Sequence, residues 1–147
     1  MPDKDEIAIG NLDEQLKRYE LLIKKREPVQ EQQLSVLLQT ALDAFDEEAA
    51  THAYILLANY HHSLTLDHIK ALDYGRLALE QSEDLPDFYW RIRALNTAAS
   101  SYHVLRDYPN ELALLQQALE LLDSSRCQSI EYYPLHHATN YALGVMY

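Results

Sequence analysis

Glycine and proline are scarce in this sequence, with 3 glycines and 5 prolines among 147 residues. An all-β domain needs many short strands joined by turns rich in these residues, so their scarcity argues against that fold class. Three scattered glycines also cannot form a loop that cradles a phosphate group. The single cysteine, Cys127, excludes a framework of intrachain disulfides and suits the reducing cytoplasm.

The sequence also lacks an apolar run of the roughly 18 residues needed to span a bilayer. Its first residues do not combine a basic start with an apolar stretch, as a signal peptide does. We therefore expect a cytoplasmic protein without membrane insertion. Basic residues are in the minority, with 12 Lys and Arg against 23 Asp and Glu and a net charge of −11. Such a chain repels phosphate backbones, so we expect no nucleic-acid partner. Solubility accounts for the acidity, and attraction of a basic partner is the alternative.

What the sequence does contain is typical of an all-α domain. Hydrophobic residues make up 48% of the chain, and leucine, alanine, glutamine and glutamate, all strong helix formers, are abundant. Apolar residues recur with the period of a helix. This periodicity predicts about seven helices, which cover residues 11–26, 28–45, 46–64, 66–83, 88–105, 109–122 and 134–147. The short connections between them imply that neighbouring helices are antiparallel.

Three sequence signals mark where helices begin. Asn11 followed by Glu14 is similar to a capping box, Pro28 suits a first helical turn, and Asp46 can cap the third helix. The clearest pair of helices is the stretch 95–121, with a tight turn at residues 107–109.

Weaker copies of that pair lie before and after it. Residues 54–61, 95–102 and 140–147 each place a small residue three positions before an aromatic residue or a histidine. The small residues are Ala58, Ala99 and Gly144, which lie 41 and 45 residues apart. The second helices align as well, with Ala71, Gly75 and Ala78 matching Glu111, Leu115 and Ala118. A small residue allows two helices to approach closely, and the bulky residue one turn later fills the neighbouring groove.

These phased copies resemble the tetratricopeptide repeat (TPR) family, in the long-repeat variant found in bacterial regulatory proteins. The resemblance implies antiparallel helical hairpins stacked in a right-handed TPR-like α-solenoid. The chain departs from the family pattern in its spacing, which exceeds the usual period of about 34 residues. It departs also at His61, Glu111 and Asn140, where the family places a tyrosine, a small residue and a large residue. An ordinary α-helical bundle is the alternative architecture.

The resemblance divides the chain into a flexible tail at 1–10 and a repeat domain at 11–147. Within the domain we expect a degenerate or capping pair at 11–45, repeats at 46–84 and 85–125, and the first helix of an incomplete repeat at 129–147. A repeat hairpin cannot bury its apolar face without the next element. We therefore expect the N-terminal sensory part of a larger bacterial signalling protein, such as a diguanylate cyclase or a transcription regulator, whose output domain after Tyr147 could be catalytic. A homodimer that pairs the terminal helices is the alternative.

Seven histidines raise the question of a metal site: His52, His61, His62, His68, His103, His136 and His137. Adjacent histidines on a helix point to different faces, and Glu48 with His52 is the one pair spaced to share a metal. No motif of a known nucleotide-binding or catalytic site is present. We expect neither a cofactor nor enzymatic activity in this segment, and a metal-dependent helical enzyme is the weakest alternative. Cys127 is expected to be an incidental surface thiol in a polar loop.

The function expected from the resemblance is binding of a protein or peptide partner, because the first helix of each TPR hairpin lines a concave face. The matching positions here are Asn59, His62, Arg93, Asn96, Ser100, His103 and Tyr141. Asparagine side chains can hold an extended peptide backbone, and Arg93 can grip a carboxylate. The lysines of the family's carboxylate-clamp subgroup are missing. Replacing Arg93 and Asn96 with alanine is expected to weaken binding of the partner without unfolding the domain.

Overall fold

The computed structural model describes residues 11–124 and 127–146, and over these residues the protein contains helices and no strand. The expectation of an all-α fold is therefore confirmed. None of the helices is long and apolar enough to cross a membrane within this described part. Within the described residues the α-helices are α2 (Leu12–Lys24), α3 (Glu31–Asp43), α4 (Glu47–Tyr60), α5 (His68–Ser82), α6 (Phe88–Val104), α7 (Tyr108–Leu122) and α8 (Tyr133–Met146). A π-helical turn, His61–Thr65, extends α4, and a 3-10 turn, Ile130–Tyr132, precedes α8.

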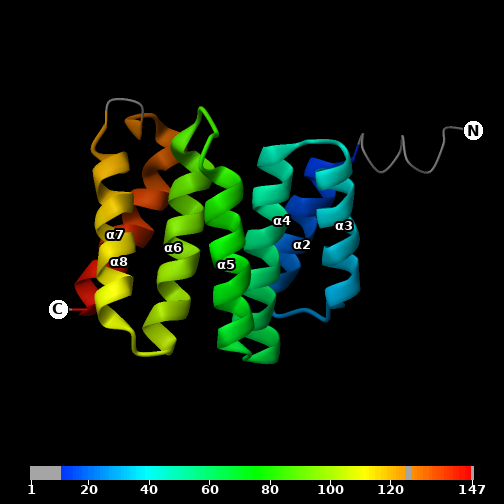
Figure 1. Ribbon diagram of the computed structural model, residues 1–147, viewed down its shortest axis with the longest axis horizontal. Coiled ribbons are helices and arrows are strands. Elements are labelled where there is room, and N and C mark those ends of the chain that lie inside the picture. The colour runs from blue at the N-terminus through cyan, green and yellow to red at the C-terminus, as the bar shows by residue number, and fades with distance from the viewer. Residues whose placement is uncertain (1–10, 125–126, 147) are drawn as a thin grey trace, which may run out of the picture.

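The helices lie side by side, with α2 and α3 at one end of the row and α7 and α8 at the other (Figure 1). Each helix packs on the next one in the chain. In addition, α2 touches α4, α4 touches α6, and α6 touches α8, whereas α3, α5 and α7 make far fewer contacts with one another. The even-numbered helices therefore share one side of the molecule, and that side carries the candidate site.

Four aspartates occur along the chain at intervals of 20 or 21 residues, and each caps the helix that follows it. The side chain of each accepts a hydrogen bond from a backbone N–H in the first turn, which satisfies one of the exposed donors at the helix start. The pairs are Asp46 with Ala49 at 3.0 Å, Asp67 with Lys70 at 3.1 Å, Asp87 with Tyr89 at 2.8 Å and Asp107 with Asn110 at 3.4 Å. The predicted cap at Asp46 is confirmed. The even spacing gives every helix from α4 to α7 a similar length.

Two of the predicted helix starts differ from the structure. The side chain of Asn11 makes no capping hydrogen bond in α2, so the expected capping box is absent there. A capping box is found in α3 instead. There the side-chain oxygen of Gln33 accepts a hydrogen bond from the backbone N–H of Gln30 at 3.1 Å. Because Gln30 is extended and precedes the helix, α3 begins at Glu31 and Pro28 lies outside its first turn.

The second helices of the two central hairpins bury the same positions. Residues 71–82 of α5 and 111–122 of α7 show one identical sequence of buried, half-buried and exposed side chains. The buried members are Ala71, Gly75, Ala78 and Ser82 in α5, and Glu111, Leu115, Ala118 and Leu122 in α7. At Gly75 a Cβ atom would lie only 3.2 Å from the Cα of Ala98 in α6. This glycine therefore allows α5 and α6 to approach closely.

Cys127 is not the surface thiol that the sequence led us to expect. Its side chain is fully buried, and it packs in a hydrophobic cluster with Ile92, Leu122, Tyr132 and Leu135. The polar residues around it indicated an exposed thiol, but Cys127 packs against the start of α6 and the end of α7. Burial among apolar side chains makes a structural role, rather than a reactive one, the physical expectation for this thiol.

Candidate functional site

Matching positions of α2, α4 and α6 form the candidate site. On α6, Tyr89, Arg93, Asn96, Ser100 and His103 follow one another at intervals of four and three residues, so they lie on one face, which we call the α6 stripe. The positions 41 residues earlier lie on α4 and its π-helical extension, and include Glu48, His52, Asn59 and His62. Asp13, Lys17 and Glu20 form the corresponding face of α2. Two pockets lie along these stripes, one toward each end of α6.

The first, the α2–α6 pocket, has a volume of about 270 Å³. Across it, Glu20 of α2 accepts a hydrogen bond from Nε2 of His52 at 3.2 Å and forms an ion pair with Arg93. The guanidinium of Arg93 also lies 5.1 Å from the ring centroid of Trp90. The carboxylate of Glu20 on α2 therefore contacts side chains of both α4 and α6.

Glu20 is ionised far more readily than an ordinary glutamate. Burial by itself would raise the pKa of its carboxyl group. The hydrogen bond from His52 and the charge and hydrogen bond of Arg93 outweigh burial, and together they lower the pKa to about 2. Arg93 is correspondingly committed to a partner within the chain, so in this arrangement its guanidinium is not free to grip the carboxylate of a bound peptide.

Asn96, in the middle of the α6 stripe, is engaged as well. Its amide nitrogen donates to the hydroxyl of Thr139 at 3.0 Å, and that hydroxyl lies 3.1 Å from the amide oxygen of Asn96. Thr139 is fully buried on α8. The pair therefore attaches α8 to α6. Since Asn96 and Arg93 both join helices, their replacement by alanine is now expected to cost stability, contrary to the expectation from sequence.

The second pocket, the α6–α8 pocket, has a volume of about 360 Å³ and brings together four of the seven residues predicted from the sequence. These are His62, Ser100, His103 and Tyr141, with Val104, Glu111, Ala138 and Ala142 beside them. Tyr141 is 68% exposed, which leaves its ring available to a ligand. The hydroxyl of Ser100 donates to the backbone carbonyl of Asn96 at 3.0 Å. Asn59 is half-buried and lines neither pocket.

The histidines of this region form pairs instead of a metal centre. Nδ1 of His103 lies 2.9 Å from the carboxylate of Glu111, which is buried on α7. Nδ1 of His62 lies 3.2 Å from Nδ1 of His68, and burial, followed by the charge of His68, lowers the pKa of His62. Among the residues that the structure describes, no three His, Cys, Asp or Glu side chains are arranged to hold a metal ion.

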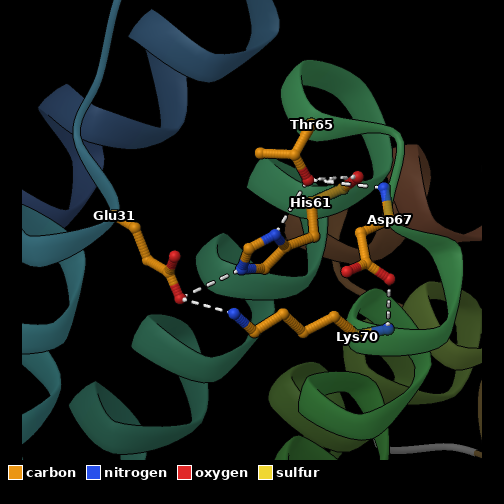
Figure 2. Close-up of polar contacts among 5 residues, drawn as sticks. All are labelled: Glu31, His61, Thr65, Asp67 and Lys70. Atoms are coloured by element: carbon orange, nitrogen blue, oxygen red, sulfur yellow. Dashed lines mark hydrogen bonds and ion pairs between the residues drawn. The ribbon is translucent and has the colours of Figure 1, made fainter.

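A separate polar cluster lies at the π-helical turn (Figure 2). His61 is buried, and its Nδ1 lies 2.9 Å from the hydroxyl of Thr65. Its Nε2 lies 3.2 Å from the carboxylate of Glu31 on α3, which Lys70 of α5 also approaches, at 3.5 Å. Burial would raise the pKa of Glu31, but the hydrogen bond and charge of His61, with Lys70, lower it. This cluster joins α3, α4 and α5 away from both pockets, so we regard it as structural.

Several residues of the site were absent from the prediction. Glu20 stands out only when α2 lies against α4 and α6, and the 41-residue offset relates Tyr89 to Glu48, which the sequence suggested only as a possible metal ligand with His52. Thr139 gives no signal, because its role depends on how α8 lies against α6. The chain matches no family model, and comparison with curated proteins and with solved structures found no match either.

Proposed function

We propose that this chain is a protein-interaction domain built from TPR-like hairpins, and that it binds a peptide segment of a partner protein along the face of its even-numbered helices. Three observations support the repeat: the aspartate caps at intervals of 20 or 21 residues, the identical burial pattern of α5 and α7, and the contacts between successive even-numbered helices. The regulatory part of the proposal, in which binding controls a bacterial signalling protein, rests on the family resemblance alone.

The observation that carries the proposal is the α6–α8 pocket. It is open to solvent and combines an exposed aromatic ring, Tyr141, with the small side chains Ala138 and Ala142 and with the imidazoles of His62 and His103. Binding sites typically pair apolar walls with a few polar groups that fix orientation. A side chain of a bound peptide could therefore enter this pocket while its backbone runs along the α6 stripe.

The experiment selects binders from a random peptide library displayed on phage and measures their affinity by fluorescence anisotropy. Ala138→Arg places a long side chain in the pocket from an exposed position, so we expect it to abolish binding of the selected peptides without unfolding the domain. Ala113→Arg is the matched control, because Ala113 is exposed on α7 and does not line the pocket. Equal binding by both variants would place the interaction elsewhere and refute the proposal.

Self-association through α8 is a second candidate, favoured by one observation. Gly144 is the small residue of the third copy, yet a Cβ atom at this position would meet nothing within 4 Å. Tyr133 and Tyr141 are exposed on the same helix. A second copy of the chain could cover this surface. Analytical ultracentrifugation tests this candidate. A dimer of the wild type that becomes a monomer in Tyr133→Glu would support it, and a monomeric wild type at high micromolar concentration would exclude it.

A further inference from the structure

The charges of the side chains that line the α2–α6 pocket are not balanced. Glu20 and Arg93 neutralise each other across the pocket. Asp13 and Glu48, which are both exposed and line the same pocket, form no ion pair within the described residues. Besides Arg93, the basic side chains of the lining are His52, which contacts Glu20, and Lys17. The rim of the pocket is therefore acidic after its internal pairing is complete.

Neighbouring groups strengthen this negative potential. Partial burial contributes most to the raised pKa of Glu48, and the charges of Asp46, Asp87 and Asp13 raise it further, so other carboxylates lie near Glu48. Asp46 and Asp87 are the N-caps of α4 and α6, so the repeat itself brings two carboxylates to this end of the groove. The whole chain carries a net charge of −11, which adds a long-range attraction for cations.

The aromatic side chains of the pocket suit an organic cation. Tyr89 and Trp90 meet edge to face, with ring centroids 5.1 Å apart. Trp90 already receives the guanidinium of Arg93 from within the chain, 5.1 Å from its centroid. The attraction of a cation to an aromatic face adds to the attraction of the carboxylates. An inorganic ion is a poorer fit, because no three metal ligands converge within the described residues.

We propose that the segment bound by this face is basic, with a lysine or arginine side chain placed between Asp13 and Glu48 and an apolar side chain in the α6–α8 pocket. The inference rests on the proposed function, since it describes the peptide that would occupy the groove. The two pockets are joined by the α6 stripe, and Tyr89 and Ser100 are eleven residues apart in one helix. That separation corresponds to about 16 Å along the helix axis, which an extended peptide covers in about five residues.

Trp90 provides the test, because it is the single tryptophan of the chain and lines the α2–α6 pocket. The probe is Nα-acetylarginine amide, and its neutral isostere, Nα-acetylcitrulline amide, is the matched ligand control. We expect saturable quenching of tryptophan fluorescence by the arginine probe alone. The double variant Asp13→Asn with Glu48→Gln should weaken that binding by about five-fold or more, and added salt should weaken it in the wild type. Glu120→Gln, on the exposed side of α7, should have no effect.

The peptides selected from the phage library separate this inference from the proposed function. When the lysines and arginines of these peptides are replaced with citrulline, their binding to the wild type should weaken. The same replacement should weaken binding to the double variant much less. If Ala138→Arg abolishes their binding but neither their basic residues nor the arginine probe depend on Asp13 and Glu48, the groove function stands and this inference is wrong. If instead the arginine probe binds as expected while Ala138→Arg leaves the selected peptides unaffected, the cationic site stands and the groove function is wrong.

Discussion

The second helices of the hairpins α4/α5 and α6/α7 bury the same positions, 40 residues apart, but three of the four buried pairs differ in side chain. Gly75 of α5 corresponds to Leu115 of α7, and both are buried. The backbone of α6 lies so close to Gly75 that even a Cβ atom would be only 3.2 Å from the Cα of Ala98, whereas the position of Leu115 holds a full leucine side chain. The helical period therefore determines which positions are buried, and the distance to the neighbouring helix determines how large the buried side chain is.

The attachments of the two hairpins also differ in charge. The α2 side of the first hairpin is joined through the ionic group of Glu20, His52 and Arg93. On the other side of α6, the neutral pair Asn96 and Thr139 attaches α8. The attachment of α2 through Glu20 should therefore respond to acid, and the attachment of α8 through Asn96 and Thr139 should not.

The largest expected effects come from enlarging the side chain at Gly75 and from shortening the side chain at the matched position, Leu115. Gly75→Leu should lower the free energy of unfolding by about 3 kcal/mol, because the new side chain would meet the backbone of α6. Leu115→Ala should cost about as much for the opposite reason, since it leaves a cavity. Urea denaturation measures both. If Gly75→Leu were tolerated within about 0.5 kcal/mol, the two hairpins would be interchangeable and the comparison would fail.

Acid should weaken the α2 end through Glu20. Its pKa is lowered to about 2 in the folded protein, so the stabilisation is complete above the ordinary pKa of 4.5 and is lost as the pH falls toward 2. The loss attributable to this group is on the order of 2 to 3 kcal/mol. When urea denaturation at about pH 6 and about pH 3 is compared, the free energy of unfolding should therefore fall less for Glu20→Gln than for the wild type.

Hydrogen exchange locates this effect along the row. Acidification should increase the exchange of amides in α2 before those in α8, because the pair that attaches α8 carries no charge. Asn96→Ala, as a control, should retain the acid sensitivity of the wild type while losing stability at every pH. Equal acid sensitivity in Glu20→Gln and the wild type would show that Glu20 does not join the helices as described.

Three connections, before α4 and inside each of the two hairpins, should gain from glycine. Phe45 and Leu66, which flank α4 and its extension, and Arg106, which precedes α7, all have a positive φ of 54° to 61°. A residue with a Cβ atom pays about 1–2 kcal/mol in this conformation, and glycine avoids that cost but loses more chain entropy on folding. Phe45→Gly, at a side chain that is 90% exposed, should therefore raise the free energy of unfolding by about 0.5–1 kcal/mol. Phe45→Ala, which keeps the Cβ atom, should give no such gain when both are compared by urea denaturation.

The helices and the matching burial of α5 and α7 could be predicted because both depend on the spacing of residues along the chain. The periodicity indicated seven helices, and the match of Ala71, Gly75 and Ala78 with their counterparts in α7 agrees with the observed burial. The contact of Glu20 with Arg93, which are 73 residues apart, depends instead on how α2, α4 and α6 lie against one another. No period in the sequence specifies that arrangement, and so Arg93 was assigned to a ligand.

Gly144 gives the smallest effect and the sharpest contrast with Gly75. In α8 a Cβ atom at Gly144 meets nothing within 4 Å, so Gly144→Ala should gain the difference in helix propensity, about 0.5–1 kcal/mol. Gly75→Ala has the same propensity gain but places its Cβ 3.2 Å from the Cα of Ala98, so its net gain should be smaller or negative. Urea denaturation at several protein concentrations distinguishes the two. A loss of stability for Gly144→Ala that grows with concentration would mean that a second copy packs on α8 at this glycine, as α6 packs on α5 at Gly75.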